Sequence, residues 1–172
     1  MLMIQIPEGV SVDIGEGVIK IKGKLGENSR KFNPHQITVK KDGNNLVIDH
    51  IQNKKLEKKL SIIEYALYKE LMSDIHGVNE YYNIKMQLVY AHFPVTLEIK
   101  EKKLYIKNLF GERTPRVAKI QGNTKVEIKA QDVNLSGTSL EDVSQTAANI
   151  RKACVAKDKD TRIFQDGIYF VE

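Results

Sequence analysis

The sequence lacks several features that would direct its interpretation toward secretion, membrane insertion or disulfide stabilisation. Its single cysteine, Cys154, excludes an intramolecular disulfide and a cysteine-based zinc site. No apolar run approaches the roughly 20 residues of a membrane span, and the N-terminus has no basic region followed by a long apolar run, as a secretory signal would. These absences predict a soluble, cytoplasmic protein of a reducing compartment. Cys154 lies in an apolar helical pattern and is expected to be a small buried side chain.

The sequence also has little that indicates catalysis or metal binding. The four histidines, His35, His50, His76 and His92, are scattered without the spacing of metal ligands. The carboxylates are interspersed with lysines, as on a solvated surface, and no nucleophile stands beside a recognisable base. We therefore expect no metal, no cofactor and no enzymatic activity.

What the sequence does contain is positive charge in its second half. The formal net charge is +5, with 41% hydrophobic and 28% charged residues, a composition typical of a soluble globular protein. Residues 1–80 hold 12 Lys/Arg against 11 Asp/Glu, whereas residues 81–172 hold 15 against 11. The net charge is therefore +1 in the first half and +4 in the second, which favours a polyanionic partner bound by the second half.

An internal repeat divides the chain. Residues 97–112 align without a gap to residues 12–27, and six of the 16 pairs are identical. Apolar residues coincide at the alternating positions of a strand. The identical pairs are Ile14/Ile99, Glu16/Glu101, Ile21/Ile106, Lys22/Lys107, Gly26/Gly111 and Glu27/Glu112. The repeat predicts two tandem modules, residues 1–80 and residues 81–172.

The first module combines strand patterns with one helix pattern. Hairpins are predicted around the turns at residues 15–17 and 42–45, and residues 24–34 are polar and typical of a turn. A stripe at helical spacing follows, with Glu64 expected on the opposite face and Gly77 as the C-terminal cap. The stripe consists of Leu56, Leu60, Ile63, Leu67, Leu71 and Ile75.

The second module repeats this order. Residues 81–94 predict a strand of the second sheet, and Val126 and Ile128 are expected to pair with a strand near Val133 and Leu135. Residues 138–141 resemble a capping box that starts the second helix. Its stripe is Leu140, Val143, Ala147, Ile150 and Cys154. The predicted fold class is α+β, with two tandem homologous modules, each a small, mostly antiparallel sheet covered by one main helix.

Basic residues of the second module form the predicted interface. Several flank a turn that contains Gly111 and Pro115, where arginine side chains are expected to point outward toward phosphate oxygens. Others follow the second helix, where they could equally be solvated charges that favour the helix dipole. Aromatic residues of the tail, Phe164, Tyr169 and Phe170, could stack on bases or hold the tail on the core. The predicted interface consists of Lys107, Arg113, Arg116, Lys119, Arg151, Lys157, Lys159, Arg162 and Tyr169.

Several longer motifs resemble one family. Residues 81–94 are similar to the pattern Tyr-x-Lys-Met-Arg-x-Val-Tyr-Ala-His-Phe-Pro of large-ribosomal-subunit protein six from archaea and eukaryotes, with Gln87 in place of the usual basic residue. The turn around Gly111, the segment 145–150 and the ending at residues 159–169 resemble the archaeal form most. The matching residues of the first motif and the turn are Lys85, Met86, Tyr90, Ala91, His92, Phe93, Pro94, Asn108, Gly111, Glu112, Pro115 and Arg116.

This resemblance, which runs essentially end to end and includes the duplication, implies an architectural role on the ribosome. The chain would bind large-subunit ribosomal RNA near the base of the factor-binding stalk and the sarcin–ricin loop. Neighbouring ribosomal proteins and translational GTPases would lie close to it, and it would not be a stand-alone oligomer. The alternative left open by the residues themselves is a two-module protein-interaction scaffold that does not bind RNA.

Overall fold

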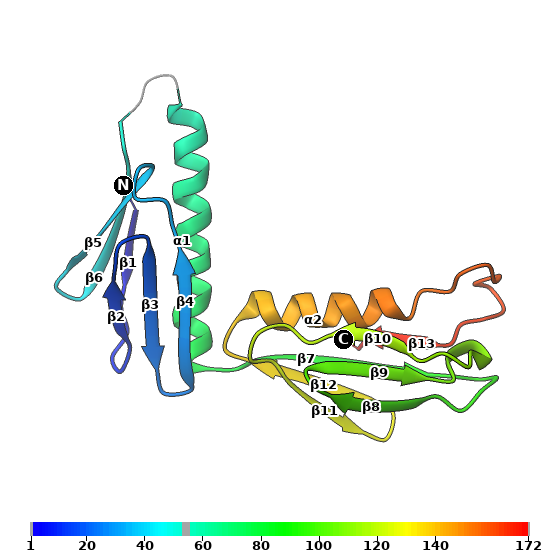
Figure 1. Ribbon diagram of the computed structural model, residues 1–172. Coiled ribbons are helices and arrows are strands. Elements are labelled where there is room, and N and C mark those ends of the chain that lie inside the picture. The colour runs from blue at the N-terminus through cyan, green and yellow to red at the C-terminus, as the bar shows by residue number, and fades with distance from the viewer. Residues whose placement is uncertain (1, 53–55, 172) are drawn as a thin grey trace. The chain divides into compact units, whose positions relative to one another are not determined.

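The computed structural model describes residues 2–52 and 56–171, and the chain divides into two compact units, residues 1–81 and residues 82–172 (Figure 1). Each unit contains small antiparallel sheets and one main helix. The predicted α+β fold class is confirmed.

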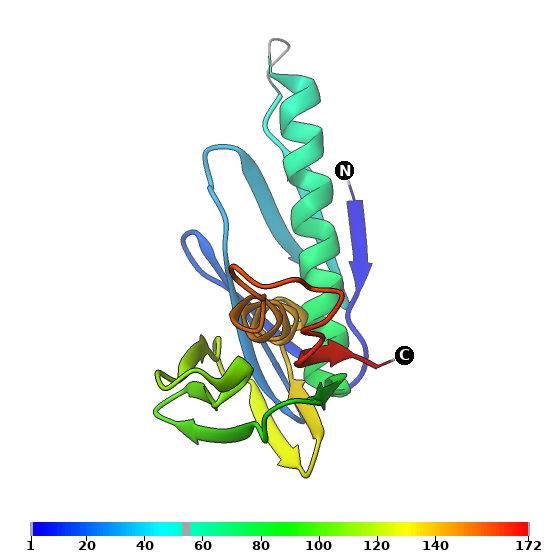
Figure 2. The ribbon, with the colours of Figure 1, turned by 90° about the vertical axis from the view of Figure 1, so that its right-hand side faces the viewer.

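Unit 1 contains two three-stranded antiparallel sheets and the long helix α1, which contacts both of them (Figures 1 and 2). One sheet has the strand order β2-β3-β4 and the other β1-β6-β5. The predicted hairpins are present as β2–β3 and β5–β6. The elements are β1 (Leu2–Gln5), β2 (Ser11–Ile14), β3 (Val18–Gly23), β4 (Gly26–Lys31), β5 (Ile37–Asp42), β6 (Asn45–His50) and α1 (Glu57–Asn79).

Strand β4 (Gly26–Lys31) lies within the segment 24–34, which the sequence predicted to be a turn. The strand has no apolar alternation, because the side chains that it directs toward α1 are polar. Asn28 Nδ2 lies 3.2 Å from Asp74 Oδ1, and Arg30 Nε lies 2.6 Å from Asp74 Oδ2. Asp74 is buried on α1. The prediction was wrong because a charged pair, rather than apolar burial, attaches this strand to the helix.

Helix α1 also differs from its predicted stripe. Glu64, expected on the outer face, is buried, while Ile63 and Leu56 are exposed. Gly77 does not cap the helix but lies buried within it, and α1 continues to Asn79. Apart from the adjacent pair Asp74 and Ile75, the core-facing side chains recur every three or four residues, and polar residues occupy two of these positions. These positions are Leu60, Glu64, Leu67, Leu71, Asp74, Ile75 and Val78.

Gly23 at the end of β3 allows the end of α1 to approach. A Cβ at this position would lie 2.7 Å from Val78 Cγ2 and 2.8 Å from Val78 O. Gly23→Ala is therefore expected to lower the unfolding free energy by about 1–3 kcal/mol through overpacking, measured by urea denaturation. The control is Gly15→Ala, where the added carbon would make only an ordinary contact, 3.5 Å from Val18 O. Equal stability of the two variants would contradict this account of the packing.

Unit 2 contains a four-stranded antiparallel sheet of order β11-β12-β7-β13, a three-stranded sheet of order β10-β9-β8, and helix α2. Residues 81–94 contribute β7 to the larger sheet, as predicted, and Val126 and Ile128 pair with Leu135 and Val133. The elements are β7 (Tyr82–Val89), β8 (Thr96–Lys100), β9 (Lys103–Lys107), η1 (Leu109–Gly111), β10 (Arg116–Lys119), β11 (Lys125–Lys129), β12 (Asp132–Gly137), α2 (Leu140–Ala153) and β13 (Gly167–Phe170).

Helix α2 begins and ends close to its predicted limits. Ser139, not Thr138, is the N-cap, and its Oγ accepts a hydrogen bond from the Asp142 backbone N–H at 3.3 Å. The capping pair therefore lies one residue further along the chain than predicted. Cys154 is buried, as expected, and burial raises the pKa of its thiol. Leu140 is exposed, whereas the other stripe residues face the core.

Candidate nucleic-acid interface

The predicted basic residues lie on segments that gather mainly at one end of unit 2. The connection from β7 to β8, the single turn η1, the end of α2 and the tail before β13 meet at the right-hand end of this unit in Figure 1. Strand β9 ends there at Lys107 and β10 begins there at Arg116. Lys119 ends β10 and therefore lies further from this end.

Arg116 has its guanidinium group directed inward, in contrast to the expectation for this turn. Its Nε and Nη2 donate to the two carboxylate oxygens of Glu112 at 2.8 and 2.6 Å. Its Nη1 donates to the carbonyl oxygens of Ala153 and Val155 at 2.9 and 2.6 Å. Only 15% of the side chain is exposed. Arg116 therefore attaches the turn to the end of α2, while Arg113 is the arginine of this turn that is exposed.

Lys107 also has an intramolecular partner. Its Nζ lies 2.5 Å from Glu98 Oε2, and Lys100 lies 2.5 Å from the other carboxylate oxygen. Hydrogen bonds from Lys100 and Lys107 lower the pKa of Glu98 to about 2. About half of the Lys107 side chain remains exposed. The lysine can approach a phosphate, but it would share its charge with Glu98.

The tail carries its predicted cations on the surface, and one of them lies beside an aromatic ring. Lys157 and Lys159 are exposed, and Lys159 Nζ lies 4.8 Å from the ring centroid of Phe164. Arg162 donates to the carboxylate of Asp160 within the same loop. Phe164 also lies against Phe110, at a centroid separation of 6.3 Å. Phe164 thus holds the tail on the core, the second of the two roles considered for it.

Arg151 and Tyr169 contact each other. The guanidinium carbon of Arg151 lies 4.6 Å from the centroid of the Tyr169 ring, a cation–π geometry. The Tyr169 hydroxyl donates to the carbonyl oxygen of Gln165 at 2.9 Å. The ring is therefore occupied on the face toward Arg151, and both residues hold β13 near the end of α2.

A groove between β10 and α2 brings together cations that are distant in sequence. Two adjoining hollows of about 460 and 380 Å³ share Val117, Lys152 and Ala153 in their linings. Lys157 lines the larger hollow and Lys119 the smaller one. Val117 is 46% exposed between these lysines. We call this surface the β10–α2 groove.

Lys152 is the basic residue of the β10–α2 groove that the predicted interface omitted. It follows Arg151 in the last turn of α2, and both residues carry the same sequence signal, a basic residue at a helix end. Only the structure distinguishes them, because Arg151 turns toward Tyr169 while Lys152 lines both hollows. Three lysines around an open, partly apolar groove can neutralise phosphates and accept a ribose or base edge between them.

Comparisons with known proteins agree with the resemblance seen in the sequence. A family model described as ribosomal protein L6 matches residues 93–167, which include η1, β10 and α2. A protein of Methanosarcina mazei named large ribosomal subunit protein uL6 is 42% identical over 98% of this chain and 94% of its own length. The chain belongs to the ribosomal protein L6 family. Relatives of the same name from Methanocella arvoryzae and Aeropyrum pernix are 40% and 35% identical, over 96% and 98% of the chain and 93% and 92% of their own lengths.

Membership of the ribosomal protein L6 family confirms the resemblance, including its archaeal type. The family is one of ribosomal proteins and not of enzymes, as the sequence predicted. The similarity to the Methanosarcina mazei protein extends over both units and is not limited to the basic second half of the chain.

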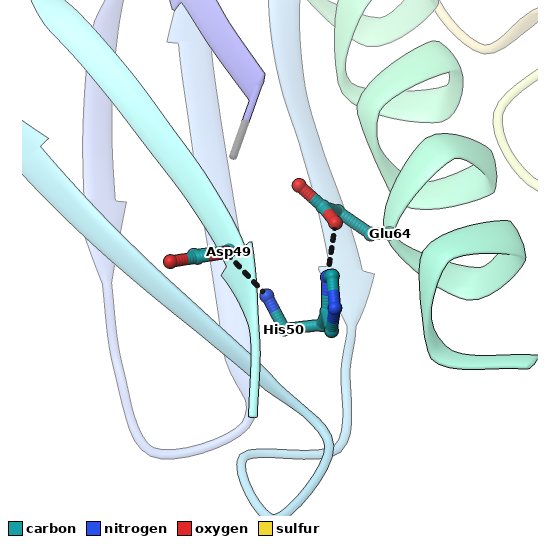
Figure 3. Close-up of side chains that lie close together, drawn as sticks. All are labelled: Asp49, His50 and Glu64. Atoms are coloured by element: carbon teal, nitrogen blue, oxygen red, sulfur yellow. Dashed lines mark hydrogen bonds and ion pairs between the residues drawn. The ribbon is translucent and has the colours of Figure 1, made fainter. Parts of the chain in front are cut away.

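In this member of the L6 family, unit 1 contains a cluster of three potential metal ligands, Asp49, His50 and Glu64 (Figure 3). Their ligand atoms all lie within 4.8 Å of one another. His50 Nδ1 lies 2.5 Å from Glu64 Oε2, and an Asp49 carboxylate oxygen accepts from the His50 backbone N–H at 3.0 Å. The His50–Glu64 contact joins β6 to α1 and accounts for the burial of Glu64. The sequence could have indicated this role, since Glu64 lies between Leu60 and Leu67 at core spacing.

Neither helix that the structure describes combines the length and the apolar character needed to cross a membrane.

Proposed function

We propose that the chain is a structural component of the large ribosomal subunit in the cytoplasm, and that unit 2 binds large-subunit ribosomal RNA through the β10–α2 groove and the adjoining tail. The observation that carries the proposal is the convergence of Lys119, Lys152 and Lys157 on one open groove. The net charge of +4 in residues 81–172 supports it, because phosphate neutralisation is the main source of affinity for nucleic acids.

The position that we propose on the ribosome follows from the family resemblance. Unit 2 would bind near the base of the factor-binding stalk and the sarcin–ricin loop, beside neighbouring ribosomal proteins and close to the translational GTPases. Its role there would be to hold RNA segments in place. The balance of +1 in residues 1–80 implies few phosphate contacts by unit 1. A crosslinking map of the chain on purified large subunits tests this placement, and crosslinks confined to a distant region of the subunit would contradict it.

The RNA proposal is tested by removing four exposed cations of unit 2 while keeping its internal ion pairs. The variant combines the substitutions Lys119→Gln, Lys152→Gln, Lys157→Gln and Lys159→Gln. Arg116 is retained, because its loss would detach the turn from the end of α2. Binding to in vitro transcribed large-subunit RNA is expected to weaken by roughly 10- to 100-fold, and the slope of log affinity against log salt is expected to fall by about 3.

The control makes the same change of charge on unit 1, at the exposed residues Lys20, Lys31, Lys40 and Lys41. It is expected to alter the affinity and the salt slope much less. If the two variants bind RNA equally well, the assignment of the RNA-binding surface to unit 2 is wrong. If the unaltered chain shows no salt-dependent affinity for RNA at all, the alternative of a protein-interaction scaffold is favoured.

A further inference from the structure

A second hollow in unit 2 lies outside the β10–α2 groove and involves none of the residues of the predicted interface. It has a volume of about 480 Å³ and lies between the end of β7, the connection that follows it, and the turn from β11 to β12. Its polar lining residues are Gln87, Tyr90, Lys129, Gln131 and Asp132. We call it the Tyr90 hollow.

The connection that carries Tyr90 is attached at both ends. The Ala91 backbone N–H donates to the buried carboxylate of Asp166 at 2.9 Å. At the other end, Asn108 Nδ2 donates to the Pro94 carbonyl oxygen at 3.0 Å. The Phe93 ring lies over Gly111, where an added Cβ would come within 3.0 Å of a ring atom.

The opposite wall of the hollow is fixed as well. The Leu88 backbone N–H donates to the Gln131 carbonyl oxygen at 2.7 Å, which joins the β11–β12 turn to β7. Ala130 in this turn has a positive φ of 53°, a conformation that holds the turn tight. Leu88 and Val95 are buried beneath the hollow. Both walls are therefore in place before any ligand arrives, which reduces the entropic cost of binding.

We propose that the Tyr90 hollow holds one unpaired base of the ribosomal RNA, stacked on the Tyr90 ring. Tyr90 is 39% exposed and lines the hollow, on a connection that is attached at both ends, so this aromatic residue can meet a base. Single-stranded RNA segments are recognised by aromatic stacking together with hydrogen bonds to base edges. The inference rests on the proposed function and adds a base-binding site to a surface otherwise defined by phosphate contacts.

The polar groups around Tyr90 suit an RNA nucleotide. The amides of Gln87 and Gln131 offer both donors and acceptors, and the Asp132 carboxylate accepts hydrogen bonds from an exocyclic amino group. Lys129 has a largely exposed ammonium group, 3.9 Å from Glu127, that can reach a flanking phosphate. An apolar protein segment would leave these amides and charges without hydrogen bonds, so the lining favours a base over such a segment.

The test uses the full chain and in vitro transcribed large-subunit RNA at fixed salt. Tyr90→Leu is expected to weaken binding by roughly 5- to 150-fold, the range that corresponds to the loss of one base–aromatic stack. Tyr90→Phe retains the ring and is expected to bind within about twofold of the unaltered chain. Tyr65→Leu is the control, because Tyr65 is an exposed tyrosine of unit 1. Ultraviolet irradiation of the unaltered complex is expected to crosslink RNA to the peptide that contains Tyr90.

The outcomes separate this site from the proposed function. If Tyr90→Leu binds like Tyr65→Leu, or if the crosslinked RNA maps elsewhere, the base site is wrong while the salt-dependent binding through the β10–α2 groove stands. If the four-cation variant binds normally, the proposed surface fails independently. Loss of subunit association with unchanged RNA affinity would identify a protein contact and overturn the base site. Should Tyr90→Leu fold poorly by circular dichroism, the position of the ultraviolet crosslink decides.

Discussion

Replacing Asp74 with alanine is expected to lower the unfolding free energy of unit 1 by about 3–5 kcal/mol, the usual cost of removing one partner from a buried ion pair. Asp74 is 1% exposed and accepts hydrogen bonds from Arg30 and Asn28. The variant would leave the Arg30 guanidinium, 17% exposed, without this carboxylate. It would also remove the contact that attaches β4 to α1.

The effect of Asp74→Ala is measured by urea denaturation together with hydrogen exchange of the β4 amides, which reports on unit 1 alone. Asp13→Ala makes the same change of charge at an exposed position of β2 and is expected to change stability by less than about 0.5 kcal/mol. A double variant, Arg30→Met with Asp74→Leu, is expected to recover most of the loss, since apolar replacement of both partners is often nearly neutral. A loss no greater than that of Asp13→Ala would show that the ion pair does not hold β4.

Replacing Arg116 with alanine is expected to destabilise unit 2 by about 2–4 kcal/mol, because four hydrogen bonds from a largely buried guanidinium group are lost. Arg116→Lys is expected to recover only part of this, since an ammonium group cannot reproduce the bidentate geometry with Glu112. Hydrogen exchange at the end of α2 and across β10 measures the loss. Exchange rates in Arg116→Ala equal to those of the unaltered chain would contradict the role assigned to this residue.

The same contact predicts a dependence on pH. Hydrogen bonding from Arg116 lowers the pKa of Glu112 below its usual value near 4.5. A carboxyl group whose pKa is lower in the folded state stabilises the fold above its unfolded pKa and loses this contribution as the pH falls through the folded value. The unaltered chain should therefore lose more stability than Glu112→Gln when the pH is lowered below about 4.5. Parallel urea midpoints for the two proteins over that range would argue against the linkage.

Apolar alternation was sufficient to predict the hairpins, and apolar residues at helical spacing were sufficient to predict the helix α2. They failed where polar contacts replace apolar burial. Strand β4 has no alternation because Asn28 and Arg30 face Asp74, and Glu64 occupies a core position because His50 meets it from β6. Such pairs join residues 14 to 46 positions apart, so no local pattern reveals them.

Charge and family motifs predicted most of the basic residues of the candidate interface. They did not predict what each of these residues contacts. Sequence alone does not distinguish an arginine that meets solvent from one that binds its own chain. Arg113 and Arg116 are close neighbours in one turn, yet the first is exposed and the second is enclosed by Glu112 and two carbonyl oxygens. The Tyr90 hollow was missed because its walls come from segments about 40 residues apart that meet only through pairing of β12 with β7.

The contacts of Arg30 and Arg116 differ in which neighbouring side chains they require. Arg30 depends on the acidic side chain of Asp74, so substitution of that helix position breaks the contact. Arg116 reaches the end of α2 through the backbone carbonyls of Ala153 and Val155, which any residue at those positions would supply. Positions 153 and 155 can therefore accept changes of side chain without losing these two hydrogen bonds. The attachment of α2 in unit 2 thus tolerates substitution at the two positions that it contacts, whereas the attachment of β4 in unit 1 requires the acidic residue that α1 carries.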